Sequence, residues 1–184
     1  DIALESIMGG SGNDKLTIGS LDDLSSDTFS VSGGAGNDVM TISTTTNGAV
    51  TPTAVAVTVM GGQGNDTLKL DDLVNVTDAS EDNFMDSLIT FADFNGDEDV
   101  LDLNGTTLDA LSNTERADIA DEDDLFAAVT KAATFAAVGE TVAFDFGGDA
   151  YIYANDTGAG FSDDDGLVKL AGFSVENFDG SNLI

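Results

Sequence analysis

The six-residue segment Gly-Gly-x-Gly-Asn-Asp occurs three times in this chain, at Gly9–Asp14, Gly33–Asp38 and Gly61–Asp66. Glycine adopts left-handed turn conformations that a Cβ atom disfavours, so each copy predicts a tight turn. The aspartate that closes each copy adds a charged oxygen to the backbone carbonyls of that turn. A chain with three such turns is restricted to folds in which the same local structure recurs.

Strand-like patterns flank every copy. The residues two and four positions after each closing aspartate are apolar, and the residue between them is polar; the apolar pairs are Leu16 and Ile18, Met40 and Ile42, and Leu68 and Leu70. Ahead of the turns, Ile7, Val31 and Val59 each stand two residues before the first glycine. Alternation with a period of two predicts strands that bury one face. We therefore predict stacked coils, each made of a strand, a turn, a second strand and a longer return loop.

A fourth, degenerate coil is predicted around Asp93–Asp99, because Leu101 and Leu103 follow Asp99 in the same register. Most of its glycines are replaced. The four closing aspartates are 24, 28 and 33 residues apart, whereas a dense array of nonapeptide repeats would give multiples of nine. We therefore expect the turns on one side of the stack only, with irregular loops at 43–53 and 71–86 on the other.

The repeated segment resembles the calcium-binding motif of the RTX family, whose members are exported by bacterial type I secretion systems. The resemblance covers residues 1–103 by motif. It implies a parallel β-helix or β-roll in which calcium lies between successive coils. Calcium accepts about six to eight oxygen ligands in irregular geometry, which suits carbonyls combined with a few carboxylates.

In that family the earlier turn of a pair supplies the carbonyls of its second and fourth residues, the later turn those of its first and third, and both supply their aspartate. The resemblance implies one site made of Gly10, Gly12, Asp14, Gly33, Ala35 and Asp38, and a second made of Gly34, Gly36, Asp38, Gly61, Gln63 and Asp66. A third would join Gly62, Gly64 and Asp66 to the fourth turn, with Gly96 and Asp99, where the motif is degenerate.

The charge balance also favours bound cations. The chain has 35 acidic and 5 basic residues, a net charge of -30 at pH 7, and self-repulsion at this level opposes a compact state. Bound calcium would offset the repulsion, and its binding free energy would become folding free energy. We therefore expect the repeats to fold on calcium binding outside the cell. Ordinary hairpin turns, or the same stack without metal, remain the alternatives.

Several function classes are excluded. The chain has no basic patch for nucleic acid, and no apolar stretch is long enough to span a bilayer. It contains no His and no Cys, so imidazole triads, His-ligated zinc and thiol nucleophiles cannot form within it. Turns and calcium account for most of the aspartates, and we expect no enzymatic activity.

Residues 104–184 are predicted to form a second unit. The acidic run Asp118–Asp124 leads into a helix at 125–133, where apolar residues recur at helical spacing. Strands at 142–146 and 150–153 flank Gly147-Gly148-Asp149 and predict a hairpin whose tyrosines pack or lie on its surface. A third strand is predicted at 167–170.

Two acidic segments have open interpretations. Asp121–Asp124 precedes the predicted helix, and Asp163–Asp165 lies in the turn before the third strand. We interpret both as solvated segments, with a further calcium site as the alternative for each. The predicted fold class is thus mainly all-β: a parallel β-helix or β-roll with calcium-binding Gly-Asp turns at 1–103, capped at 104–184 by a β-rich region with one short helix.

The last strands resemble the C-terminal region of type I secreted proteins, in which the final residues carry an uncleaved export signal. The corresponding segment here is Gly160–Ile184. The resemblance implies the type I secretion machinery as a partner during export. The chain starts without a cleavable signal pattern, and we expect it to be part of a longer protein.

Two functions fit these observations. One is a calcium-dependent structural or assembly module of a secreted bacterial surface protein, either a surface-layer protein or an adhesin, that associates with itself or with other domains of the same long chain. The alternative is the folding and export module of a secreted protease or lipase whose catalytic domain lies upstream. The sparse motifs, with Thr-, Ala- and Val-rich insertions between them, favour the surface protein.

Overall fold

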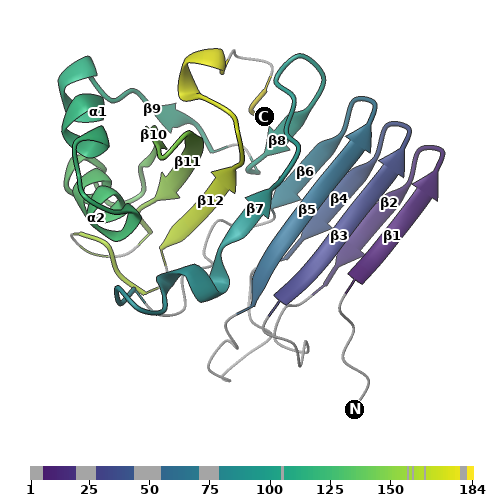
Figure 1. The fold of residues 1–184 in the computed structure, drawn as a ribbon, viewed down its shortest axis with the longest axis horizontal. Coiled ribbons are helices and arrows are strands. Elements are labelled where there is room, and N and C mark those ends of the chain that lie inside the picture. Colours follow the sequence, from purple (N-terminus) through teal and green to yellow (C-terminus); the bar gives the residue numbers. More distant parts are fainter. Residues whose placement is uncertain are drawn as a thin grey trace.

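The computed structural model describes residues 6–19, 28–43, 55–70, 79–104, 106–156, 158, 160–163, 165–178 and 182–184 (Figure 1). Each coil contributes one strand to each of two facing sheets. The strands before the turns are β1 (Ser6–Ser11), β3 (Thr28–Ala35), β5 (Ala56–Gln63) and β7 (Ile89–Phe91). Those after the turns are β2 (Lys15–Ile18), β4 (Val39–Ile42), β6 (Thr67–Leu70) and β8 (Val100–Asp102).

All neighbouring strands of the four coils pair in parallel, as the predicted coil stack requires. In the first sheet Ile7 lies beside Val31, Val31 beside Val59, and Val59 beside Phe91. The second sheet has the order β2-β4-β6-β8 and the equivalent register. The register confirms that the three glycine turns are structurally equivalent and places Asp99 beside Asp66 in the same ladder.

The core of the stack lies between the two sheets. The apolar residues predicted to face inward are buried there, and the list includes Val31, Met40, Ile42, Val59, Leu68, Leu70 and Leu101. Strand alternation therefore correctly predicts the inward face of each coil. The first coil is less covered: Ile7 and Leu16 are only partly buried, because only one side of that coil packs against another.

The first sheet continues beyond the coils into the second half of the chain. Its full order is β1-β3-β5-β7-β12-β11-β10-β9, with β9 at Leu108–Asp109, β10 at Thr141–Phe146, β11 at Asp149–Ala154 and β12 at Gly166–Leu170. The β10–β11 hairpin and β12 are the predicted strands. Because β12 pairs with β7, the sheet crosses the domain boundary predicted at residue 103.

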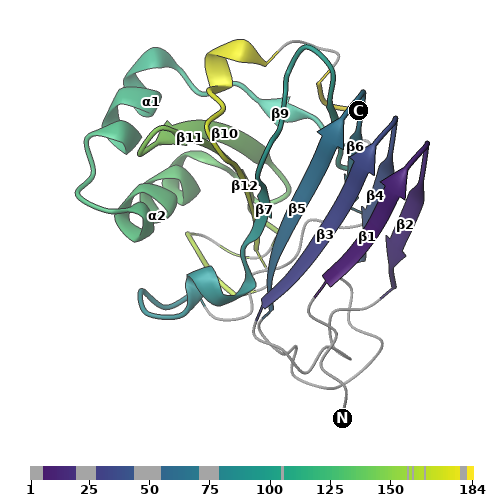
Figure 2. The same ribbon diagram turned by 45° about the vertical axis from the view of Figure 1, so that its right-hand side comes forward.

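Two helices cover the outer face of this extension (Figure 2). The helix α2 (Leu125–Phe135) confirms the predicted one. The helix α1 (Asn113–Ala120) was not predicted, although Ser112 and Glu115 form a capping box around its first turn. Alternate strand residues, such as Val142 and Phe144, pack beneath the helices, while their neighbours face the core of the stack. None of the described helices is long and apolar enough to cross a membrane.

The chain end belongs to the fold. Leu183 forms a parallel bridge with Leu101, and the Ile184 N–H donates to the Leu101 carbonyl over 3.1 Å. Short 3-10 helices occur at Phe84–Ser87 and Val175–Asn177. The C-terminal segment therefore covers the edge of β8, at the opposite end of the stack from β1.

Candidate metal centre in the glycine turns

The three glycine turns lie directly against one another. Gly10, Gly34 and Gly62 occupy equivalent positions with φ of 109°, 112° and 102°. A Cβ atom on Gly34 would collide with the Gly10 carbonyl oxygen, and one on Gly62 would collide with the Gly34 carbonyl. Glycine is required there for both its backbone conformation and this close approach, which aims the carbonyls of the second position at the next coil.

The carbonyls of the first and third positions face the preceding coil instead. The third-position carbonyl of Ala35 accepts from the Gly12 N–H at 2.7 Å, and that of Gln63 accepts from the Gly36 N–H at 2.8 Å. First-position carbonyls face the earlier coil too, since a Cβ on Gly9 would lie 2.6 Å from the Gly33 oxygen. Carbonyls from both turns thus line the junctions between the first three coils.

The closing aspartates form a ladder along the stack. The Asp14 N–H donates to Asp38 Oδ1 over 2.8 Å, the Asp38 N–H to Asp66 Oδ1 over 2.8 Å, and the Asp66 N–H to Asp99 Oδ1 over 2.9 Å. A parallel ladder links the Asn37 N–H to Asn13 Oδ1 at 2.9 Å. Each of Asp38, Asp66 and Asp99 therefore uses one oxygen to fix the register with the coil before it.

The second carboxylate oxygen is buried without a hydrogen-bond donor in Asp14, Asp38 and Asp66. Asp38 is 0% exposed and Asp66 is 1% exposed. A buried carboxylate oxygen that lacks a partner is costly, so these atoms require a cation or a donor. A buried carboxylate oxygen without a hydrogen-bond donor thus occurs at all three glycine turns, and this is the observation that best fits a bound metal ion.

Two of the unpartnered oxygens lie close to a carbonyl of the next coil. A Cβ on Gly9 would lie 2.6 Å from the Gly33 carbonyl oxygen and 2.7 Å from Asp14 Oδ2, so both oxygens lie beside Gly9. The same pattern recurs one coil later with Gly33, Gly61 and Asp38. A set made only of carbonyl and carboxylate oxygens suits calcium among the common metals.

The glycine turns supply more carbonyls than carboxylates. Within the described part of the chain, no three Asp or Glu side chains gather around one point. Each junction instead combines one or two aspartates with backbone oxygens. The residues present therefore fit the two sites that the resemblance implies between the first three coils, and which ligands bind remains a prediction.

The fourth turn differs from the other three. The N–H of Gly61 donates to Asp93 Oδ1 at 2.9 Å, 32 residues away, whereas Asp66 and Asp99 are 33 residues apart. The fourth turn thus contains one residue more than the third. Asp99 uses both oxygens, because its Oδ2 accepts from the Asn95 N–H at 2.8 Å.

Two of the residues predicted for the third site, Gly96 and Asp99, are engaged in other contacts. Asn182 Nδ2 donates to the Gly96 carbonyl at 2.6 Å, and a Cβ on Gly96 would lie 2.8 Å from the Phe173 ring. Asp93 was not predicted as a site residue; its carboxylate binds the N–H groups of Gly61 and Gly62. Ile89 and Phe91 of β7 alternate in the sequence as Val57 and Val59 of β5 do, and the two pairs lie side by side. Counting two residues on from Phe91 and Val59 places Asp93 opposite Gly61.

Burial, more than the neighbouring charges, raises the pKa of two carboxylates in the ladder. Burial raises the pKa of Asp66 above its ordinary value, the hydrogen bond from the Asp38 N–H opposes this, and the charges of Asp99, Asp38 and Asp93 raise the pKa further. Burial likewise raises the pKa of Asp99 against hydrogen bonds from the N–H groups of Asn95 and Asp66. A cation among these oxygens would counteract both effects, since it favours the charged form.

The two other acidic segments have structural roles. Asp165 is 0% exposed and accepts from the Tyr153 hydroxyl at 2.8 Å and the Ser162 N–H at 2.7 Å, so the prediction that it lies in a solvated turn is wrong. Asp163 is exposed, and the middle residue of that run lies outside the described residues. Tyr153 is buried, which confirms packing for the hairpin tyrosines.

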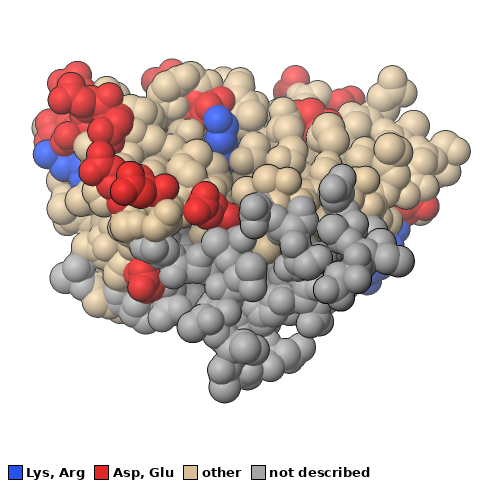
Figure 3. Space-filling view, turned by 60° about the horizontal axis from the view of Figure 1, so that its bottom comes forward, with Lys and Arg blue, Asp and Glu red and all other residues tan. Residues whose placement is uncertain are grey.

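The Asp121–Asp124 segment joins the two helices and is largely exposed. Asp124 caps α2 by accepting from the Ala127 N–H at 2.8 Å, and Glu122 pairs with Lys131 at 3.2 Å. Figure 3 shows acidic side chains gathered at the helical end on the left. The interpretation as a solvated acidic cap therefore fits this segment.

Two solution structures resemble the chain, those of the AlgE6R2 and AlgE6R3 subunits of the mannuronan C5-epimerase from Azotobacter vinelandii. The first is 18% identical with a TM-score of 0.38, over 98% of this chain and 91% of its own. The second is 16% identical with a TM-score of 0.38, over 96% and 80%. No protein-family model and no curated protein match the chain. Because both TM-scores are low, the description of the fold rests on the strand pairing of this structure.

Proposed function

We propose that the chain is a calcium-dependent structural and assembly module of a secreted bacterial surface protein, either a surface-layer protein or an adhesin. Calcium ions bind between successive glycine turns and fold the stack outside the cell. The module has no catalytic activity of its own. Its partners are calcium, further copies or domains of the same protein, and the type I secretion machinery during export.

One observation carries the proposal: the repeated unpartnered oxygen of Asp14, Asp38 and Asp66, which at Asp14 and Asp38 lies close to a carbonyl of the adjoining coil. The net charge of -30 gives it a thermodynamic reason, because repulsion among unneutralised carboxylates opposes the compact state. Folding that requires extracellular calcium also keeps the chain extended before export, since metal binding and folding are coupled.

A calcium titration of the chelator-treated chain tests the proposal, with circular dichroism and light scattering recorded together. The proposal predicts cooperative folding accompanied by growth of particles. Folding to a stable monomer would instead favour the export and folding module of a secreted protease or lipase. No response to calcium would contradict both functions.

The alternative function has one supporting observation of its own. Residues 182–184 are part of the fold, since Leu103 donates its N–H to the Ile184 carbonyl at 3.0 Å beside the Leu101–Leu183 bridge. A segment held on the stack in this way suits a module that folds as one unit during export. The Leu183→Asp variant should be measured for the stability of the stack and for the amount of protein secreted. Loss of both would support a folded segment that is needed for export.

A further inference from the structure

A surface hollow of about 520 Å³ lies between α1, β10 and the 3-10 helix Val175–Asn177. Figure 2 shows α1 and this 3-10 helix, in yellow, at the top of the molecule. The volume suits a small molecule, since ligand sites in proteins typically measure about 300–1,000 Å³. The hollow is lined by Asn113, Arg116, Ala117, Ala120, Asp145 and Glu176.

The hollow contains an arginine without an ion pair. Arg116 is the only arginine of the chain, and its side chain is half-buried. Three lysines each pair with a carboxylate at 3.2 Å or less, namely Lys69, Lys131 and Lys169. Among the described residues Arg116 has no such partner, although Asp145 and Glu176 line the same hollow. The hollow therefore keeps opposite charges apart, with the guanidinium on α1 and the carboxylates on the other two elements.

The acidic side of the hollow is held in place by hydrogen bonds. Asp145 Oδ1 accepts from the Val175 N–H at 2.8 Å, and Oδ2 accepts from the Ser174 hydroxyl at 3.2 Å. These bonds attach the 3-10 helix to β10. A carboxylate offers about four acceptor positions, so Asp145 can also accept from a ligand. The Glu176 carboxylate has no partner among the described residues and is available as a second acceptor.

The other side of the hollow is one face of α1. Its lining residues are three or four positions apart in the helix and therefore point the same way. The capping box of Ser112 and Glu115 fixes the first turn of this helix. Arg116 thus lies beside Ala117 and Ala120, which add a small apolar surface next to the guanidinium.

We propose that the hollow binds a zwitterionic small molecule, an α-amino acid with an apolar side chain. Arg116 binds the ligand carboxylate, because the planar guanidinium matches its two oxygens. The ligand ammonium group donates to Glu176 and Asp145. The apolar side chain packs on Ala117 and Ala120. This site is separate from the glycine turns and does not depend on whether the chain assembles.

The charges favour a zwitterion over a simple ion. The net charge of -30 and the two carboxylates beside Arg116 repel an anion. A simple cation is repelled by Arg116 and leaves the guanidinium without a partner. A molecule with one ammonium and one carboxylate group has no net charge and complements both sides of the hollow.

The experiment titrates three probes into the 184-residue chain in calcium and records amide chemical shifts by two-dimensional NMR. The probes are L-leucine, N-acetyl-L-leucine, which lacks the ammonium group, and L-leucinamide, which lacks the carboxylate. Their side chains are identical. L-Leucine should shift the amides of residues 113–120 and 174–177. Each of the other two should bind about tenfold more weakly or worse, since one charged hydrogen-bonding group is lost.

Matched variants locate the two poles of the site. Arg116→Gln should weaken leucine binding by about tenfold or more, whereas Lys131→Gln, which removes the same charge from α2 outside the hollow, should leave it unchanged. Glu176→Gln should also weaken binding, and Asp118→Asn, at an exposed position of α1 that does not line the hollow, is its control.

Three outcomes would overturn the proposal. One is that L-leucine leaves the amides of residues 113–120 and 174–177 unshifted at millimolar concentration. Another is that N-acetyl-L-leucine or L-leucinamide binds as tightly as L-leucine, because the site would then recognise only one charge. The third is that Lys131→Gln weakens binding as much as Arg116→Gln. None of these results would bear on the calcium-dependent folding of the repeats.

Discussion

The third and fourth turns of the stack contain aspartates that are equivalent in the ladder but differ in their second oxygen. Asp66 Oδ2 is buried without a donor, whereas Asp99 Oδ2 accepts from the Asn95 N–H of its own turn. The glycine turn leaves its backbone oxygens facing the junction. The fourth turn, one residue longer, satisfies its aspartate internally and has its Gly96 carbonyl bound by Asn182.

The difference shows that two aspartates in the same register can have different surroundings. Glycine at the second position brings the carbonyl of one coil against the next, and a residue with a Cβ atom would prevent this approach. Where the glycines are lost, donors from the chain itself bind the Asp99 carboxylate and the Gly96 carbonyl. We therefore predict metal ions only at the junctions between the first three coils.

Gly34→Ala should have the largest effect, because the new Cβ would meet the Gly10 carbonyl in a backbone conformation with φ of 112°. We expect a loss of more than about 4 kcal/mol in unfolding free energy with calcium present. Gly148→Ala is the control: φ is 93° but the space around it is open, so its cost should be about 1–2 kcal/mol. Urea denaturation compares the two, and equal losses would refute the role of close coil contact.

Asp38→Asn should remove calcium, because Asp38 is predicted to serve the junctions on both sides. Isothermal titration should show fewer ions bound than in the unchanged protein, and a larger loss than for Asp14→Asn, which serves one junction. Asp99→Asn should leave the stoichiometry unchanged and cost about 1 kcal/mol, since the neutral amide weakens one charge-assisted hydrogen bond. Equal stoichiometry for Asp38→Asn and Asp14→Asn would argue against ligands shared between sites.

Acidification should stabilise the chelator-treated chain. Both Asp66 and Asp99 have a pKa raised above the ordinary 3.8, so the folded state holds these protons more tightly than the unfolded state. Their contribution is complete below pH 3.8 and is lost as pH rises through the raised values. Circular dichroism of the chain in chelator at about pH 4 and about pH 7 measures the trend as a gain of folded structure at the lower pH. A double variant, Asp66→Asn with Asp99→Asn, should reduce that gain; less folded structure at the lower pH in the unchanged chain would count against the account.

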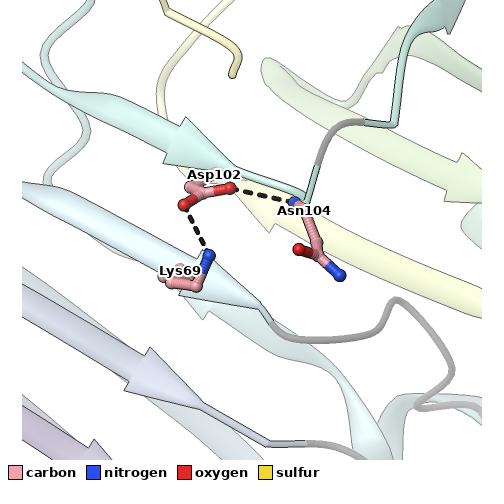
Figure 4. A network of polar contacts seen from close by, with 3 residues as sticks. All are labelled: Lys69, Asp102 and Asn104. Carbon is pink, nitrogen blue, oxygen red and sulfur yellow. Dashed lines mark hydrogen bonds and ion pairs between the residues drawn. The ribbon is translucent and has the colours of Figure 1, made fainter.

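Lys69→Met should have the smallest effect. Lys69 and Asp102 form an ion pair of 2.8 Å on the outer face of the stack, and the Asn104 N–H donates to the same carboxylate (Figure 4). Their side chains are 32% and 19% exposed, so we expect a loss below about 1 kcal/mol. Lys15→Met, on an exposed position of β2, is the control.

The same pair gives a prediction of opposite sign on acidification. Burial would raise the pKa of Asp102, but the hydrogen bond from Lys69, that from Asn104 and the lysine charge outweigh it and lower the pKa below 3.8. Its stabilisation is therefore present above pH 3.8 and is lost as pH falls through the lowered value. NMR titration of the Asp102 carboxyl should show the pKa rise in Lys69→Met, and an unchanged pKa would contradict the pairing.

Local repetition made the coils predictable. Period-two alternation around Val31, Met40 and Leu68 correctly placed strands on the inner faces, because each coil buries one side of each strand. The hairpin and the helix α2 were predictable for similar reasons. The capping box at Ser112 also marks α1 in the sequence, but its weakly apolar turns carry no clear helical periodicity.

Long-range contacts were the part that sequence patterns could not supply. Nothing in the neighbourhood of Asp165 indicates that Tyr153 will bury it, since that contact depends on how β11 pairs with β12. The role of Asp93 depends on one extra residue in the fourth turn, which becomes visible only when β7 is aligned with β5. The motifs thus predict which residues can bind a metal ion. The pairing of the strands determines which of those residues lie close together.

The most direct test is a crystal structure of the calcium-bound chain with anomalous scattering recorded at long wavelength. The account predicts one peak between Asp14 Oδ2 and the Gly33 carbonyl and another between Asp38 Oδ2 and the Gly61 carbonyl, with none held by Asp99 and Gly96. Glycine turns without anomalous peaks, or ions bound only at the exposed Asp121–Asp124 segment, would contradict it.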